Sequence, residues 1–201
     1  MKKGERTRYH LLETATNIVG KEGIEFLTAR NLADRANVSL GIINHYFPKF
    51  LEIFAEITEY IFNIHRPSVR NNSLPTPEER LYFQIEANFT VSVLNYPEQY
   101  KALLLSYYYM GVNKRITKFL REELKGSIGD TEKYLLEAIQ SRGKRAIDAQ
   151  GFAQSIAEQN EGGLVFCSML KNKKEKLAYS KAHLERQKKQ IELYLSSLPS
   201  I

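Results

Sequence analysis

The stretch from residue 28 to residue 46 has the pattern of two short helices joined by a tight turn. Thr28 and Ser39 each stand directly before a helical pattern, and both are residue types that favour the N-cap position. Asn37 lies between the two helices and tolerates the left-handed conformation that a sharp turn needs. A helix pair of this kind near the N-terminus of a basic chain is suited to reading the major groove of DNA. This feature therefore constrains both the fold and the function.

The side chains of the helix pair divide into an inward and an outward set. The inward set, which is expected to anchor the pair, consists of Leu32, Ala33, Ala36, Ile42 and Ile43. The outward set consists of Leu40, Asn44, His45 and Tyr46. Gly41 has no side chain, and we expect it to stand where two backbones approach closely.

Composition bounds the class of protein. The chain has 201 residues, 43% of them hydrophobic, which suits one large helical unit or one core with a small appended module. Its net charge of +6 is compatible with a polyanionic partner without identifying one. Cys167 is the single cysteine, which excludes an intramolecular disulfide and favours a reducing compartment. The four histidines lack the spacing of metal ligands.

Two features of the sequence bear on location. No apolar run approaches the roughly 18 residues of a membrane span, so no contact with a membrane is expected. The basic N-terminus leads into an amphipathic segment and lacks the pattern of a signal peptide. We therefore expect a cytoplasmic protein.

Hydrophobic periodicity predicts helices along the whole chain, and no segment shows the alternation of a strand. Pro48 and Pro77 are each placed to begin a helix. A segment rich in Pro, Ser and Asn predicts a loop at 66–77, and two glycines predict a turn at 126–130. The helices expected outside the pair cover residues 7–19, 48–64, 77–95, 97–108, 112–125, 131–141, 152–170 and 174–198. The predicted fold class is all-α, with an N-terminal three-helix domain followed by a larger helical domain.

The last predicted helix carries an apolar residue every seven positions, at Leu177, Leu184, Ile191 and Leu198. Such a stripe implies contact between helices. It is explained either by packing onto the chain's own core or by a subunit interface, and we favour a contribution to a dimer bundle. The residues predicted for that interface are Phe152, Ile156, Gly163, Cys167, Leu177, Leu184, Ile191 and Leu195.

Several short pieces of the N-terminal region occur in a distinctive order and spacing. They are Leu11–Ala15, Glu22-Gly23, Leu27–Ala33, Asn37–Gly41 and His45–Pro48. On these pieces, residues 7–54 resemble the DNA-binding domain of the tetracycline-repressor (TetR) family of bacterial transcription regulators. The chain departs from the family pattern at Phe50, where a phosphate-contacting lysine is usual and Lys49 lies one residue earlier. It departs again at Asn44, where an aromatic residue is common.

The resemblance implies a division of labour along the chain. Residues 1–47 are expected to form the helix-turn-helix DNA-binding domain, and residues 48–201 a helical domain for ligand binding and dimerisation. The implied protein is a homodimeric repressor that binds a palindromic operator in double-stranded DNA and is released by a small molecule. No cofactor is implied.

The helix from Ser39 to Tyr46 is expected to enter the major groove, where each base pair presents a distinct set of donors and acceptors. Asn44 is the best candidate for base readout, because its amide pairs with adenine, and Leu40 is placed to meet a thymine methyl. Cationic and hydroxyl side chains nearby are expected to contact phosphate. The full set of predicted DNA contacts is Arg6, Arg8, Thr28, Arg30, Ser39, Leu40, Gly41, Asn44, His45, Tyr46 and Lys49.

The resemblance also implies a pocket for a largely apolar or aromatic effector, and aromatic and polar residues on the later helices fit one. The residues predicted to line it are Phe62, His65, Asn88, Phe89, Tyr107, Tyr108, Met110, Gln159 and Asn160. The alternative for the aromatic members is a place in the core, which is the commoner fate of such residues.

The sequence also bears on three other functions. A DNA-binding adaptor or architectural protein without an inducer shares the helix pair but needs no cavity. An enzyme is not expected, because the chain has no phosphate-binding glycine loop, no HExxH motif and no nucleophile elbow. A protein-interaction module is suggested by the Lys-rich segment 171–189, although a solvated helix face explains that segment.

Overall fold

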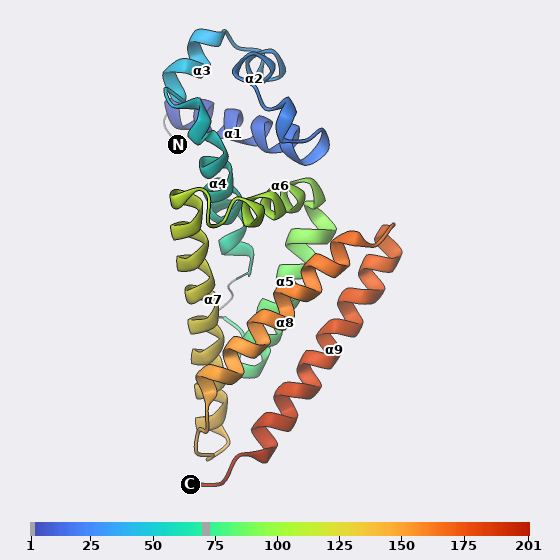
Figure 1. Ribbon diagram of the computed structural model, residues 1–201. Helices are drawn as coiled ribbons and strands as arrows, with labels where there is room; N and C mark the ends of the chain where they lie inside the picture. The colour runs from blue at the N-terminus through green and yellow to red at the C-terminus, as the bar shows by residue number, and fades with distance from the viewer. Residues whose placement is uncertain (1–2, 70–72) are drawn as a thin grey trace. The chain divides into compact units, whose positions relative to one another are not determined.

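The computed structural model describes residues 3–69 and 73–201, and within these ranges the fold is all-α, as predicted (Figure 1). The N-terminal helices are α1 (Lys3–Lys21), α2 (Ala29–Ala36), α3 (Leu40–Tyr46) and α4 (Ile53–Val69). They are followed by α5 (Pro77–Phe89), α6 (Pro97–Tyr108), α7 (Lys114–Ser141), α8 (Ala149–Met169) and α9 (Lys173–Ser197). Short 3₁₀ turns are η1 (Ile24–Phe26) and η2 (Phe50–Glu52), and η3 (Thr90–Asn95) is π-helical.

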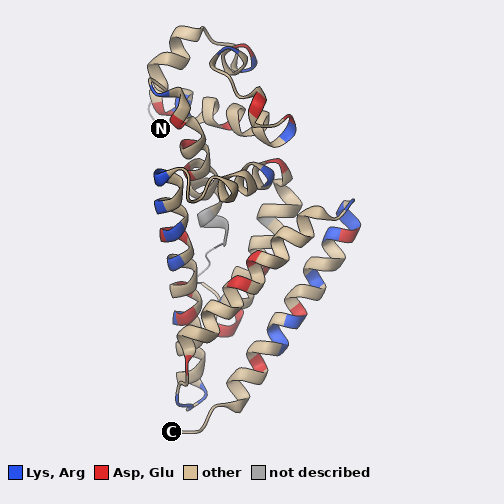
Figure 2. Cartoon of the chain, viewed as in Figure 1, with Lys and Arg blue, Asp and Glu red and all other residues tan. Residues whose placement is uncertain are grey.

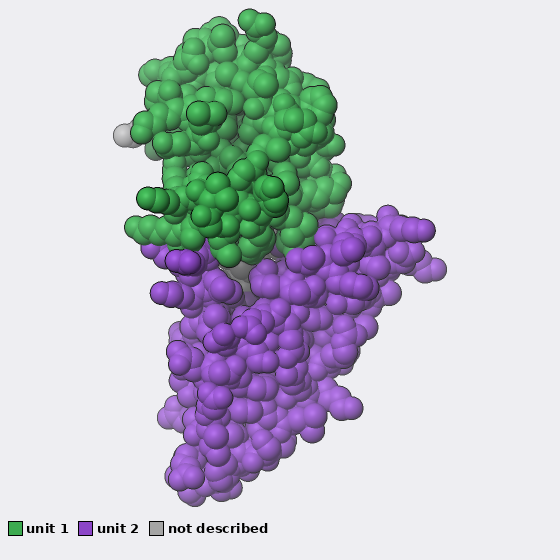
Figure 3. All heavy atoms as spheres, viewed as in Figure 1, with its two compact units in different colours: residues 1–64, 96–119 green, residues 65–95, 120–201 purple. Residues whose placement is uncertain are grey.

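The chain packs as two compact units, coloured separately in Figure 3. Unit 1 consists of residues 1–64 and 96–119, and unit 2 of residues 65–95 and 120–201. This division follows packing. The boundary predicted between residues 47 and 48 concerns function, and it stays a prediction.

The core of unit 1 is built on α1 and α6. Leu11, Ala15 and Ile18 recur at helical spacing along α1, and all three are buried. Gly20 near the end of α1 lies so close to α6 that a Cβ atom there would stand 2.1 Å from the carbonyl oxygen of Glu98. No side chain fits in that gap, so the close contact of the two helices depends on glycine at position 20.

Two predicted boundaries of α4 are wrong. Pro48 lies in a turn, and the helix begins only at Ile53, after the 3₁₀ turn η2. The fixed φ of proline suits a turn as well as a first helical turn, so the residue type alone does not separate the two. At its other end α4 continues to Val69, so the predicted loop at 66–77 is wrong for residues 66–69. Residues 70–72 lie outside the described ranges.

The predicted start of α5 is confirmed. Thr76 occupies the N-cap, Pro77 follows as the first helical residue, and Thr76 and Glu79 form a reciprocal capping box. That box satisfies two of the backbone N–H groups that a helix N-terminus leaves without a partner.

The predicted turn at 126–130 is wrong, because α7 runs unbroken from Lys114 to Ser141. A glycine inside a helix costs only about 1 kcal/mol relative to alanine. Tertiary packing outweighs this cost, since Leu135 and Ile139 on the following turns are buried in unit 2. The hydroxyl of Thr131 donates to the carbonyl of Ser127 within the predicted turn, as expected of a continuous helix.

The core of unit 2 is formed by α5, α8, α9 and the later part of α7. Leu184, Ile191 and Leu195 of α9 and Leu198 directly after it are buried within the chain, and Leu177 is exposed. Packing of α9 onto its own unit therefore accounts for most of the seven-residue stripe. Ile156 and Cys167 of α8 are likewise buried in the chain, so these side chains have little surface left to offer a second subunit.

His183 of α9 is an unexpected member of this core. Its ring lies 4.8 Å from that of Phe89 and close to Gly163, where a Cβ would stand 2.6 Å from the imidazole Cε1. Gly163 thus makes room for a histidine of its own chain. Burial, assisted by the positive charge of Arg186, lowers the pKa of His183 to about 4.

Replacing Gly20 by alanine should destabilise the protein by on the order of 1–3 kcal/mol, because the added methyl group meets the backbone of α6. Gly129→Ala is the matched control. A Cβ at Gly129 meets nothing within 4 Å, so this change should stabilise the protein by about 0.5–1 kcal/mol. Urea unfolding of both variants checks the prediction, and a Gly20→Ala protein as stable as the parent would contradict the described α1–α6 contact.

The free energy of unfolding should fall as the pH is lowered from about 6.5 to about 4. In this pH window His183 is protonated in the unfolded chain and neutral in the folded chain, because its pKa in the folded chain lies below the usual 6.5. Protonation therefore favours the unfolded chain. His183→Gln should flatten this part of the stability profile. His45→Gln, at an exposed histidine, should leave it unchanged. Urea midpoints at several pH values measure the effect, and identical profiles for the parent and His183→Gln would refute it.

Candidate nucleic-acid interface

The turn between α2 and α3 has the predicted geometry. Thr28 caps α2, its hydroxyl accepting a hydrogen bond from the backbone N–H of Asn31 at 3.1 Å. Asn37 adopts the left-handed conformation with φ 53° and ψ 48°. The N–H of the next residue, Val38, donates to the carbonyl of Ala33 and closes the turn. The sequence signals of this turn are local, and the structure confirms them.

The second helix of the pair is anchored differently from the prediction. Ile43 is fully buried and Phe47, one turn later, is 2% exposed, whereas Ile42 is 37% exposed. Successive residues of a helix point about 100° apart, and of these two isoleucines only Ile43 is turned into the core. The predicted close approach at Gly41 is also wrong. A Cβ there meets only the Ser39 hydroxyl, at 3.6 Å.

The anchors leave one face of α3 open. Leu40, Gly41, Asn44 and His45 are exposed on it, and Tyr46 is half-buried with its ring against that of His45. Ser39 occupies the N-cap position, but its side chain makes no capping hydrogen bond, contrary to the prediction. The exposed polar groups of α3 are thus the Asn44 amide and the His45 imidazole, with the Ser39 hydroxyl at the N-cap.

The predicted phosphate contacts around the pair fall into two groups. Thr28, Arg6 and Arg30 are exposed, and so is Lys49, whose ammonium lies 3.5 Å from a carboxylate oxygen of Glu52. Arg8 instead makes its contacts within the chain.

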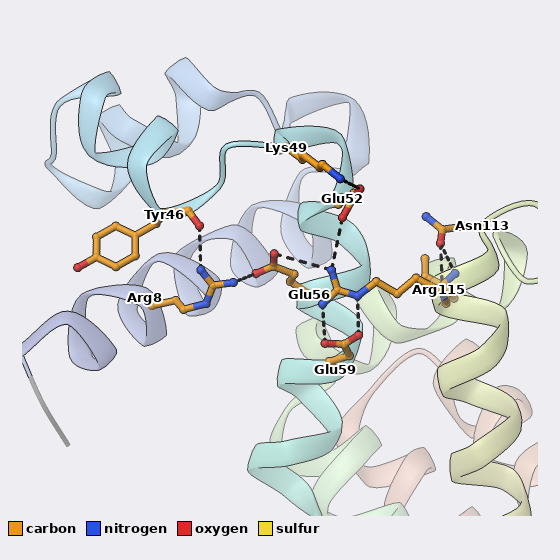
Figure 4. A network of polar contacts seen from close by, with 9 residues as sticks. Arg8, Tyr46, Lys49, Glu52, Glu56, Glu59, Asn113 and Arg115 are labelled. Carbon is orange, nitrogen blue, oxygen red and sulfur yellow. Dashed lines mark hydrogen bonds and ion pairs between the residues drawn. The ribbon is translucent and has the colours of Figure 1, made fainter.

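Arg8 joins α1 to the end of α3 and to α4 (Figure 4). Its guanidinium donates to the carbonyl of Tyr46 at 2.8 Å, forms an ion pair with Glu56, and lies 5.0 Å from the centre of the Phe47 ring. To reach phosphate, the side chain would have to leave all three partners.

A second arginine completes this network. Arg115, in the first turn of α7, makes two parallel 2.8 Å hydrogen bonds with the carboxylate of Glu59. Its guanidinium also lies 3.7 Å from Glu52 and 3.9 Å from Glu56. The hydrogen bonds to Glu59 raise the pKa of Arg115. Sequence reasoning missed the network. The spacing of the glutamates was a visible signal, but their partners are far away along the chain.

The nine residues predicted for an effector pocket are divided between the two units. Phe62, Tyr107, Tyr108 and Met110 belong to unit 1, and His65, Asn88, Phe89, Gln159 and Asn160 to unit 2. The Phe62 ring packs on that of Phe119 at 5.4 Å, and Phe89 packs on His183, so both have core contacts. Tyr108 is 78% exposed. A shallow depression on α7, near Lys133 and Leu136, contains none of the nine.

Unit 2 has buried polar groups that the prediction mostly missed. Asn160 was among the residues predicted for the effector pocket, and the structure adds three more buried polar side chains. Each side chain has one oxygen or nitrogen atom that makes no hydrogen bond within the described part of the chain. They are Gln84, Asn160, His183 and Gln187. The four-residue spacing of the last two along α9 was the available signal, since it puts two polar residues on one helix face.

The described residues also bear on whether the chain has a metal site, a membrane span or a protein-interaction segment. Among the described residues, no group of three or more His, Cys, Asp or Glu side chains is placed to hold a metal ion. In the same ranges, no helix has the length and hydropathy that crossing a membrane requires. The Lys-rich segment 171–189 lies mostly on α9, where lysines and arginines occur along the earlier part of the helix, as far as Lys189 (Figure 2).

Comparison with known proteins relates this geometry to a family. Residues 11–57 match the model of the bacterial regulatory proteins of the tetR family. A TetR transcription regulator from Haloarcula marismortui is similar in fold, with a TM-score of 0.78 and 16% identity over 96% of this chain and 98% of that one. No curated protein matches the chain.

Two further solved structures contain bound ligands. A putative transcriptional regulator from Saccharomonospora viridis in complex with choline has a TM-score of 0.74 and 13% identity, covering 97% of this chain and 99% of that one. AibR in complex with isovaleryl coenzyme A and operator DNA has a TM-score of 0.68 and 14% identity, covering 89% and 97%. At such identities the likeness shows the fold.

Thr28 and Ser39 should respond differently to alanine substitution. Thr28→Ala removes the capping hydrogen bond of α2 and should cost about 1 kcal/mol of stability. Ser39→Ala removes no capping bond and should change stability by about 0.5 kcal/mol or less. Urea unfolding of the two variants provides the measurement. Equal losses would mean that both hydroxyls cap their helices.

Proposed function

We propose that the chain is a ligand-responsive transcriptional regulator of the tetR family of bacterial regulatory proteins, whose model residues 11–57 match. It acts as a homodimeric repressor on a palindromic operator and leaves the DNA when a small molecule binds. As a protein that works on DNA, it acts in the cytoplasm of a bacterial cell.

The exposed face of α3 carries this proposal. A helix held by Ile43 and Phe47 presents Leu40, Asn44 and His45 together, and a major groove admits one helix. Asn44 is the base-reading residue, since its amide offers a donor and an acceptor to the edge of adenine. Thr28, Arg30 and Lys49 surround this face and bind phosphate, which sets the register on the duplex.

A palindromic operator requires two copies of the helix pair. Support for a homodimer comes from the apolar side chains that α8 and α9 leave exposed, namely Val165, Phe166, Met169, Leu177 and Leu193. Of the residues predicted for the interface, Leu177 and the partly exposed Phe152 retain surface for a partner. The buried residues predicted for the interface pack under these exposed side chains and hold their helices in place.

An effector is supported by the family fold and by ligands in similar structures. Choline occupies one such protein, and isovaleryl coenzyme A occupies another together with operator DNA. We propose a largely apolar or aromatic effector for this chain, bound without a cofactor. The second candidate is an adaptor without an inducer, which the core contacts of Phe62 and Phe89 favour.

Selection of bound fragments from a random duplex pool at moderate salt tests the proposal, and a palindrome should be enriched. With that duplex, Asn44→Ala should weaken binding by about 10- to 100-fold, the loss expected for one bidentate base contact. Asn63→Ala is the control, because Asn63 is an exposed asparagine on α4. It should bind as the parent does.

Binding without sequence preference and with a steep salt dependence would contradict the regulator. If a palindrome is enriched, compounds are screened for release of the labelled duplex. Release by a small molecule supports the repressor, and a duplex that no compound releases favours the adaptor.

A further inference from the structure

Three glutamates follow one another along one side of α4 and the turn before it. Glu52, Glu56 and Glu59 are spaced by four and three residues, so their carboxylates are neighbours. Like charges at this spacing destabilise a helix, and they also repel DNA phosphates. Their presence next to a candidate DNA interface therefore needs a physical reason.

The structure supplies one, because the three carboxylates surround Arg115. The planar guanidinium binds Glu59 with two parallel hydrogen bonds, the strongest arrangement for such a pair, and lies within 4 Å of Glu52 and Glu56. Glu56 is the least exposed of the three, with 17% of its side chain accessible. The glutamates thus hold the first turn of α7 against α4 within unit 1.

Glu56 is shared with a second cation. Its other carboxylate oxygen pairs with Arg8, and Arg8 in turn donates to the carbonyl of Tyr46. Tyr46 is the last residue of α3, where backbone carbonyls lack helical partners and a positive charge is favourable. An unbroken series of polar contacts therefore leads from Arg115 through Glu56 and Arg8 to the end of α3 (Figure 4).

We propose that Glu56, held between Arg8 and Arg115, positions α3 for DNA recognition. This inference rests on the proposed function. Arg8, Glu56 and Arg115 are positioning residues that act through the Tyr46 carbonyl, and none of them touches a base. Glu52 lies near both Lys49 and Arg115, so the two cations compete for its negative charge.

Glu56→Gln separates positioning from simple electrostatics, because the two predict opposite signs. Removal of a negative charge beside the interface should strengthen DNA binding if only charge matters. If Glu56 positions α3, the variant should bind the selected duplex about tenfold more weakly, while its affinity for random duplex does not fall. Glu13→Gln is the control, since Glu13 is exposed on α1 and has no ion pair in the described ranges.

Arg115→Gln provides an independent arm. Its matched control is Lys114→Gln. Lys114 is the neighbouring residue, its side chain is exposed, and the change removes the same positive charge. Arg115→Gln should weaken binding of the selected duplex several-fold more than Lys114→Gln does. The Arg115→Gln and Glu56→Gln losses should not add in the double variant, because both break the same series of contacts.

Arg8→Gln distinguishes a positioning role from a phosphate contact. A lost phosphate contact lowers the slope of log affinity against log salt by about 1. The positioning role leaves the slope unchanged and weakens binding of the selected duplex alone. Thermal unfolding shows whether each variant is folded. If Glu56→Gln does not fold, Arg115→Gln tests the positioning role in its place, because the Arg115 side chain is half-exposed.

The outcomes separate this inference from the proposed function. If the parent protein selects no sequence, the proposed function fails. If the parent is selective and Glu56→Gln binds the selected duplex as tightly as Glu13→Gln, the positioning role is overturned and the proposed function stands.

Discussion

The burial of Ile43 and Phe47 is the contact on which the candidate interface depends. These two side chains, one helical turn apart, press the seven-residue α3 onto the rest of unit 1. A helix of that length has little stability of its own, so tertiary contact must hold it in place. The same packing leaves Leu40, Asn44 and His45 exposed. Anchoring and readout are thus two consequences of one packing arrangement.

Packing fixes the rotation of α3 about its axis, and charge restrains its end. Arg8 binds the terminal carbonyl of α3 at Tyr46 and is itself held by Glu56. Isolated ion pairs at a surface contribute little, about 0–1 kcal/mol. Here a partly buried carboxylate joins two arginines from different helices, so loss of one partner affects the others. The two arginines thereby offset two of the three negative charges of Glu52, Glu56 and Glu59.

The features that sequence reasoning predicted correctly are local in the chain. The N-cap at Thr28, the left-handed Asn37 and the capping box before α5 each involve residues a few positions apart. The failures are also instructive. Ile42 was expected in the core because the sequence does not distinguish two neighbouring isoleucines, and only the packing of α3 shows that Ile43 alone is buried. The turn at 126–130 was predicted from glycines whose cost the packing of α7 outweighs.

The sequence by itself determined that the chain is helical, where most of its helices begin, and that residues 28–46 form a helix-turn-helix. Helical periodicity and capping act within one or two turns, so they are legible without the fold. Only the tertiary structure decided that Arg8 turns inward, that Arg115 joins three glutamates, and that Gly163 makes room for His183. Arg8 and Arg115 meet partners 48 and 56 residues away, and His183 lies 20 residues from Gly163. No local pattern specifies such pairs, because they form only once separate helices have packed.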